Sequence, residues 1–198
     1  MFLGNDPWSV PSLQALATDP VFEVALVITN PPRPAGRGSR LSPTAVAGAA
    51  RSSGVPILEA DGVRGGTALE AIRETAPDAL VVVAYGQLLS PEVLAVPELG
   101  AVNVHFSLLP RWRGASPVQH ALLEGDTTTG VTIMMMDTGL DTGPILATTA
   151  ADIEESDDAA SLGSRLADTG GVLLARTLSG LGSLRPTPQS AEGVTYAP

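Results

Sequence analysis

The chain has 198 residues, a length that suits one domain of ordinary size with a substantial apolar core. It carries 21 acidic and 11 basic residues, and every basic residue is Arg. The formal net charge of −10 argues against broad nucleic-acid binding by phosphate neutralisation, although it allows a local basic patch. Because the chain has no Cys, a disulfide framework and a thiolate zinc site are excluded.

No apolar run approaches the roughly 20 residues that are needed to span a bilayer. The N-terminus lacks the basic region and long apolar stretch of a secretory signal. We therefore expect a cytoplasmic protein that binds no membrane, and we take a monomer as the working expectation.

The first half of the chain alternates short apolar strands with helices. A strand is expected to end near Phe2, followed by strands at 22–29, 55–58 and 79–84 and by helices at 10–17, 43–53 and 67–75. Ser9 and Thr67 are the expected N-caps of two of these helices. The run 79–84 is continuously apolar, which is typical of a central parallel strand that is covered on both faces.

Residues 30–43 contain three Pro before a Gly-x-Gly and are predicted to form a loop without regular structure. From 30 to 51 there are four Arg and no acidic residue, the one clear basic island of an acidic chain. A solvated loop explains this pattern as well as a phosphate-binding arm does. In the second interpretation, guanidinium groups would provide bidentate phosphate contacts.

A polar pair stands on one face of a predicted buried strand, 101–105. Asn103 and His105 are two residues apart, so both side chains point to the same face. Burying an amide and an imidazole is unfavourable unless each has a partner. The strand ends before a loop, and in an open α/β sheet ligands bind where parallel strands end.

A second predicted strand, 131–136, leads into a loop with two acidic and two Gly residues at 137–143, and a strand at 145–149 is expected to pair with it. A helix at 117–124 and a final helix to about 178, capped by Ser156, complete the prediction. The expected domain is 1–182, and 183–198 is expected to be a linker or tail.

Three motifs in order resemble the 10-formyltetrahydrofolate-dependent formyltransferases. They are Asn103-x-His105, the Ser-Leu-Leu-Pro at 107–110 and the Leu-Asp-x-Gly at 140–143. The Arg-rich stretch 33–38 is similar to the loop of those members that act on methionyl initiator tRNA. The resemblance implies an α/β, Rossmann-like, mostly parallel sheet flanked by helices, and formylation of initiator tRNA for translation initiation. The resemblance implies that the relatives continue into a C-terminal β-barrel domain, and we expect that domain to be absent here.

The resemblance also implies the roles of individual residues. In formyl transfer to an amine, Asn103 would donate an N–H to the oxyanion, His105 would move the proton and Asp141 would orient the imidazole. The co-substrate would be 10-formyltetrahydrofolate, and no metal would be needed. The residues implied in folate binding are Gln87, Leu88, Leu89, Ser107, Leu108, Leu109, Pro110 and Asp137. Those implied in tRNA binding are Arg33, Arg37 and Arg40.

Two other functions remain open at the level of sequence. One is formylation of a small amine, either a sugar nucleotide or glycinamide ribonucleotide. The other is a truncated, non-catalytic folate- or RNA-binding module, which the short first strand suggests. The chain also departs from the family pattern, because Phe106 stands where many relatives have Gly or Pro, and this side chain could narrow the opening of the site.

Overall fold

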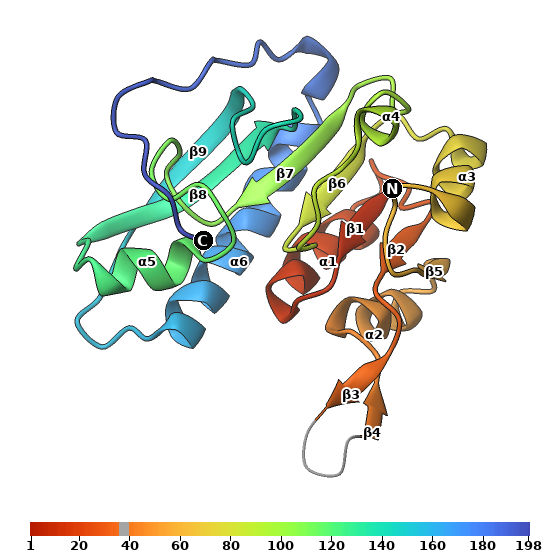
Figure 1. Cartoon of the computed structure of the whole chain (residues 1–198), viewed down its shortest axis with the longest axis horizontal. Coiled ribbons are helices and arrows are strands. Elements are labelled where there is room, and N and C mark those ends of the chain that lie inside the picture. Colours follow the sequence, from red (N-terminus) through yellow and green to blue (C-terminus); the bar gives the residue numbers. More distant parts are fainter. Residues whose placement is uncertain (36–39) are drawn as a thin grey trace.

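A computed structural model describes residues 1–35 and 40–198, which form a seven-stranded sheet in the order β5-β2-β1-β6-β7-β8-β9 (Figure 1). The first five strands of this order are parallel, and β8 runs antiparallel to both neighbours. The strands are β1 (Phe2–Gly4), β2 (Val27–Thr29), β5 (Ile57–Glu59), β6 (Leu80–Val83), β7 (Ala101–His105), β8 (Thr128–Met135) and β9 (Ile145–Asp152). The predicted mostly parallel α/β sheet is therefore confirmed.

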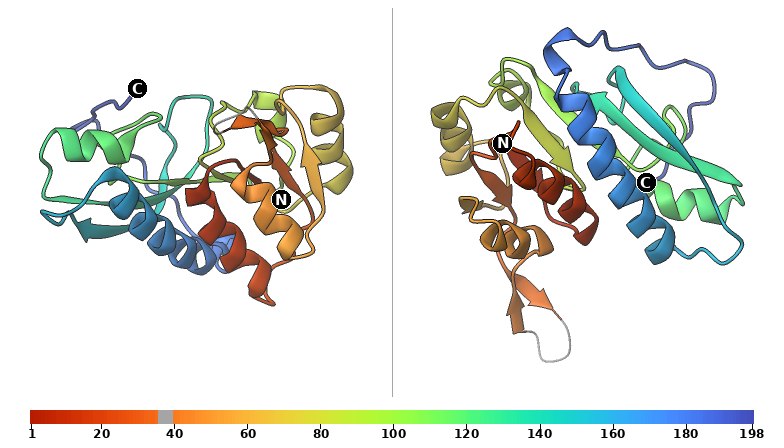
Figure 2. Two further views of the ribbon diagram at one scale, coloured as in Figure 1. Left: turned by 90° about the horizontal axis from the view of Figure 1, so that it is seen from below. Right: turned by 180° about the vertical axis from the view of Figure 1, so that it is seen from behind.

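Helices cover both faces of the sheet (Figure 2). One face carries α1 (Val10–Thr18), α2 (Ala45–Ser52) and α6 (Ala159–Leu178), and the other carries α3 (Gly66–Thr75) and α4 (Pro91–Leu94). The short α5 (Pro117–Leu123) follows the loop after β7, and 3-10 turns lie at Pro7–Ser9 and Leu181–Ser183. None of the helices in the described ranges is both long and apolar enough to cross a membrane.

The central strand β6 explains the continuous apolar run of the sequence. Val81 and Val83 belong to the core under α1 and α6, whereas Leu80 and Val82 belong to the core under α3. All four side chains are buried because both faces of this strand are covered.

Two of the three predicted helix caps are wrong. Ser9 does occupy the N-cap position of α1, but its hydroxyl forms no capping bond and donates instead to the carbonyl of Val83 at 2.7 Å. Thr67 lies inside α3, and Ser156 lies upstream of α6, whose N-cap is Asp158. Oδ1 of Asp158 accepts hydrogen bonds from two backbone amides of the first turn, and a negative carboxylate at this end also interacts favourably with the helix dipole.

The predicted loop at 30–43 is also corrected, because it contains a two-stranded antiparallel sheet of β3 (Arg33–Ala35) and β4 (Arg40–Ser42). Pro34 pairs with Leu41 in the register. In a two-stranded sheet each strand is an edge strand, so Pro can be accommodated where its missing N–H would face solvent. The β3–β4 pair projects from the domain beside α2 (Figure 1).

The C-terminal segment, defined here as 187–197, lies against the loops that follow β7 and β8. Thr187 pairs with Ile145 through two backbone hydrogen bonds. Near its end, the amide of Ala197 donates to the carbonyl of Arg113 at 2.7 Å, and Ala197 is fully buried. The segment thus packs on the domain, while the predicted domain boundary at 182 stays a prediction.

Candidate active site

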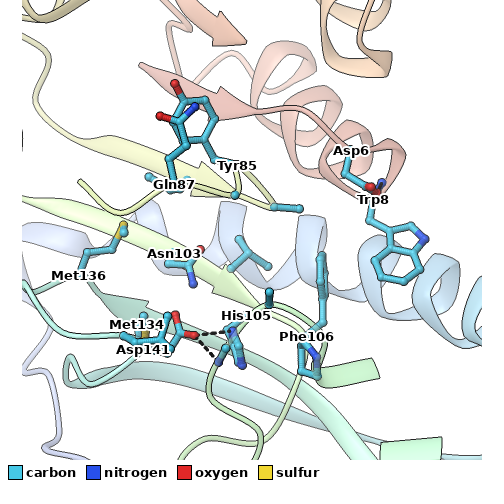
Figure 3. A pocket seen from close by; sticks show the side chains of 18 of the residues that line it. Asp6, Trp8, Tyr85, Gln87, Asn103, His105, Phe106, Met134, Met136 and Asp141 are labelled. Carbon is cyan, nitrogen blue, oxygen red and sulfur yellow. Dashed lines mark hydrogen bonds and ion pairs between the residues drawn. The ribbon is translucent and has the colours of Figure 1, made fainter. Parts of the chain in front are cut away.

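A cavity of about 710 Å³ opens beyond the carboxyl ends of the parallel strands β1, β6 and β7 (Figure 3). The chain order reverses between β1 and β6, since β2 follows on one side of β1 and β6 lies on the other. Such switch points are where α/β sheets bind ligands, and the volume is in the range of small-molecule sites.

The strand β7 directs its two polar side chains into this cavity. Val102 and Val104 point into the core under α6, so Asn103 and His105 point to the opposite face, as the alternation of a strand predicts. Both are buried, with 9% and 5% of their surface exposed.

His105 is held by a backbone carbonyl. Its Nε2 lies 2.8 Å from the oxygen of Trp112. A carbonyl only accepts, so Nε2 must carry the proton, and in the neutral ring Nδ1 keeps its lone pair. This Nδ1 lies 3.7 Å from Oδ2 of Asp141. Burial lowers the pKa of His105 below its ordinary value of 6.5, against the opposing effects of the Asp141 charge and the Trp112 carbonyl. The ring is therefore a neutral base with a free lone pair beside a carboxylate.

Asp141 is fixed from several sides. Its Oδ2 accepts a hydrogen bond of 2.7 Å from the amide of Gly114. Its backbone adopts the left-handed region, with φ of 52°. Two residues later, Gly143 lies so close to the carbonyl of Met135 that a Cβ would collide with it. These contacts hold the carboxylate next to the imidazole, as Figure 3 shows.

Asn103 differs from His105 in having an unused side chain. Within the residues that the structure describes, its amide forms no hydrogen bond with another residue, although the side chain reaches the cavity (Figure 3). An amide that lines a cavity and has no protein partner is available to a ligand oxygen.

Three of the residues that were implied in folate binding line the cavity. They are Gln87, Leu88 and Asp137. Gln87 lies across the cavity from Asp141, beside Tyr85 (Figure 3), and its Nε2 donates to the carbonyl of Asp61 at 2.9 Å. The carboxylate of Asp137 accepts two hydrogen bonds from its own turn.

The other five implied folate residues do not line the cavity. Leu89 is buried in the core under α3, and the hydroxyl of Ser107 donates to the carbonyl of Arg111 at 2.6 Å. The remaining three, which lie in the same turn, are Leu108, Leu109 and Pro110. None of these five residues lines the cavity. Their direct contact with a ligand therefore stays a prediction that the structure does not support.

Of the three implied tRNA contacts, the two in described strands, Arg33 and Arg40, do not line the cavity. Arg33 lies exposed on β3, and Arg40 begins β4. Arg37 lies outside the described residues. The β3–β4 pair thus carries Arg at both of its described ends, on a projection from the domain (Figure 1).

Sequence reasoning missed Trp8 and the two methionines as walls of the cavity, whereas Phe106 was expected at the opening. Trp8 and Phe106 form an edge-to-face pair with ring centroids 6.0 Å apart and line one wall, and the methionines Met134 and Met136 line another. Trp8 follows the end of β1, so the rule that ligands bind at strand ends could have located it. Phe106, with Trp8, thus sets the shape of this wall.

A family profile described as formyl transferase matches residues 1–178. The chain belongs to the formyl transferase family. Within it, the chain is 51% identical over its whole length to the methionyl-tRNA formyltransferase of Halorhodospira halophila and 48% identical to that of Streptomyces coelicolor. It spans 64% of the length of each of these relatives.

Solved structures show the same formyltransferase fold. Phosphoribosylglycinamide formyltransferase from Bacillus halodurans matches with a TM-score of 0.75 at 26% identity, over 92% of this chain and 94% of that one. The N-formyltransferase from Helicobacter canadensis matches with a TM-score of 0.76 at 19% identity, over 99% of this chain and 69% of that one. Among the residues that the structure describes, no group of three or more His, Asp or Glu side chains is arranged to hold a metal ion.

Proposed function

We propose that this formyltransferase domain transfers the formyl group of 10-formyltetrahydrofolate to the α-amine of methionyl initiator tRNA, for translation initiation. The observation that supports this reaction type is that Asn103, His105 and Asp141 line one cavity. The identity of the formyl acceptor is inferred from the relatives, which are named methionyl-tRNA formyltransferases.

The proposed reaction begins with attack of the amine on the formyl carbon. The developing oxyanion accepts an N–H of Asn103, whose amide has no other partner among the described residues. A donor of this kind contributes about 10²–10³ in rate. As the C–N bond forms, Nδ1 of His105 takes the proton of the amine, and the imidazolium is stabilised by Asp141 at 3.7 Å. Collapse of the tetrahedral intermediate breaks the bond to the folate nitrogen, which receives a proton from the imidazolium.

The folate would occupy the cavity through its apolar walls and a few polar groups. Leu88, Met134 and Met136 offer apolar surface for a pterin ring, and Gln87 and Asp137 offer polar atoms at the rim. Figure 3 shows the methionines on the same side as Asp141. This arrangement would place the formyl group of a bound folate near His105.

The tRNA would contact the β3–β4 pair. Arg33, Arg37 and Arg40 belong to the one basic stretch of a chain with net charge −10, so phosphate attraction would be confined to this region. The exposed side chain of Arg33 is accessible for such a contact. A small-amine substrate would make no use of these residues.

The test is formyl transfer from 10-formyltetrahydrofolate to methionyl initiator tRNA by this chain, with His105→Ala as the inactive control. Transfer by the parent and a loss of about 10²–10⁴ in the variant support the proposal. Transfer to a sugar-nucleotide amine or to glycinamide ribonucleotide, with none to the tRNA, would instead favour a small-amine enzyme. Folate binding without transfer to any of these amines would favour a binding module.

A further inference from the structure

One side chain of the C-terminal segment joins two loops of the candidate site. The Nε2 of Gln189 donates to the carbonyls of Asp141 and Gly143, both at 2.8 Å. Its Oε1 accepts from Nε and Nη2 of Arg113, at 3.1 and 2.7 Å. Arg113 belongs to the loop after β7, and Asp141 to the loop after β8, so the Gln189 amide connects the two segments that carry the site.

Gln189 bonds Asp141 at a residue whose backbone conformation is strained. A non-Gly residue with φ of 52° is in the left-handed region, which is unfavourable for a side chain unless the surroundings hold it. The carbonyl of Asp141 is held by Gln189, and its carboxylate is held by the amide of Gly114. The two contacts together determine where Oδ2 lies relative to the ring of His105.

The C-terminal segment also contacts the residue that holds His105. The hydroxyl of Thr195 accepts a hydrogen bond of 2.8 Å from the amide of Trp112, whose φ is 62°. The carbonyl of Trp112 is the partner of His105 Nε2. The C-terminal segment therefore contacts the supports of both the imidazole and the carboxylate.

We propose that Gln189 is a positioning residue, which holds the Asp141 carboxylate beside His105 through the backbone of the Asp141 loop. Its kinetic consequence rests on the proposed function, whereas its effect on the two side chains does not. The alternative is a purely structural role, in which Gln189 only attaches the C-terminal segment to the buried guanidinium of Arg113, which is 9% exposed.

Two variants separate these roles. Gln189→Glu keeps an oxygen acceptor for Arg113 but places its second oxygen against the carbonyls of Asp141 and Gly143, which can only accept. Gln189→Met keeps the length of the side chain and loses both sets of hydrogen bonds without adding charge. Gln14→Ala, an exposed position on α1 away from the cavity, is the control for a Gln substitution.

The first readout is an NMR titration of the imidazoles, which needs no substrate. The chain has two His residues, so a His120→Gln substitution assigns the remaining imidazole signal to His105. Asp141 is the charged group that raises the pKa of His105 against the effect of burial. In Gln189→Met the carboxylate should move away, and the His105 midpoint should shift to lower pH relative to the parent and to Gln14→Ala. An unchanged His105 midpoint in a folded Gln189→Met would overturn the positioning role.

The second readout is kinetic. Displacement of a catalytic group by about 1 Å costs on the order of 10²-fold, so both variants should lower kcat by 10- to 100-fold with little change in the KM of the formyl donor. Gln189→Glu decides the matter even if Gln189→Met is poorly folded. If Gln189→Glu, which keeps its acceptor for Arg113, retains the parent kcat and His105 midpoint, then Gln189 is only a structural link. A parent that transfers no formyl group would refute the proposed function but leave the titration informative.

Discussion

The amide of Gly114 donates to Oδ2 of Asp141 at 2.7 Å, across 27 residues of sequence. Gly114 has a φ of 121°, and a Cβ at this position would collide with the carbonyl oxygen of Ala197. The hydrogen bond therefore depends on a backbone conformation and on a close approach that only Gly allows. Gly114 therefore lies between the carboxylate beside His105 and the buried Ala197 of the C-terminal segment.

Gly114→Ala should destabilise the domain by roughly 1–3 kcal/mol, because it adds steric overlap to the cost of a positive φ. Urea unfolding measures this difference. Gly54→Ala is the matched control, since Gly54 also has a positive φ, 69°, but has open space around its Cβ position. Equal losses in the two variants would show that the approach of Ala197 does not matter.

The pKa of His105 should lie below 6.5, because burial disfavours the charged ring. The folded state then binds fewer protons than the unfolded state, so this group makes stability fall as pH drops through about 6.5. Asp141→Asn should lower the pKa of His105 further, since the carboxylate is a cause that raises it. NMR titration of the imidazole in the parent and in Asp141→Asn checks the sign. A higher midpoint in the variant would contradict the assignment of Asp141 as its charged neighbour.

Asn103→Ala should reduce kcat by about 10²–10³ while folate binding is retained, because the amide would act on the oxyanion rather than on the ground state. Transfer kinetics and folate titration measured on the same preparation separate the two effects. As a control for removal of a buried polar group, Ser12→Ala changes a hydroxyl of α1 that has no hydrogen-bond partner among the described residues. A similar loss of kcat and folate binding in Asn103→Ala would point to a collapsed cavity instead.

Arg33→Ala and Arg40→Ala together should raise the KM for methionyl initiator tRNA and leave the KM for the formyl donor unchanged. Each lost phosphate contact should reduce the salt dependence of tRNA binding by about 0.7–0.9 in the slope of log K against log salt. Arg73→Ala, on the exposed face of α3 with 57% of its side-chain surface accessible, controls for the loss of positive charge. An equal effect of Arg73→Ala would mean that net charge, and not the β3–β4 pair, governs binding.

Much of the sheet could be predicted from the sequence, because local composition and alternation determine which residues are buried in a strand. The run Leu80–Val83 was apolar throughout and became a central strand, and β7 took the predicted residues Ala101–His105. The sequence did not show that the hydroxyl of the N-cap residue Ser9 bonds a neighbouring strand instead of its helix, nor that Asp158 takes the capping position predicted for Ser156.

The candidate site was also predicted only in part from the sequence. The alternation of β7 alone places Asn103 and His105 on one face, and a motif resemblance adds Asp141 as their partner. The sequence could not show that the lone pair of His105 lies at Nδ1, because Nε2 must donate to the carbonyl of Trp112, which is visible only in the structure. Nor could it show that Gln189 and Thr195 reach the site, because their partners lie 46 to 83 residues away in sequence. Local sequence patterns determine which face a side chain takes, whereas hydrogen bonds between distant loops depend on the whole chain closing upon itself.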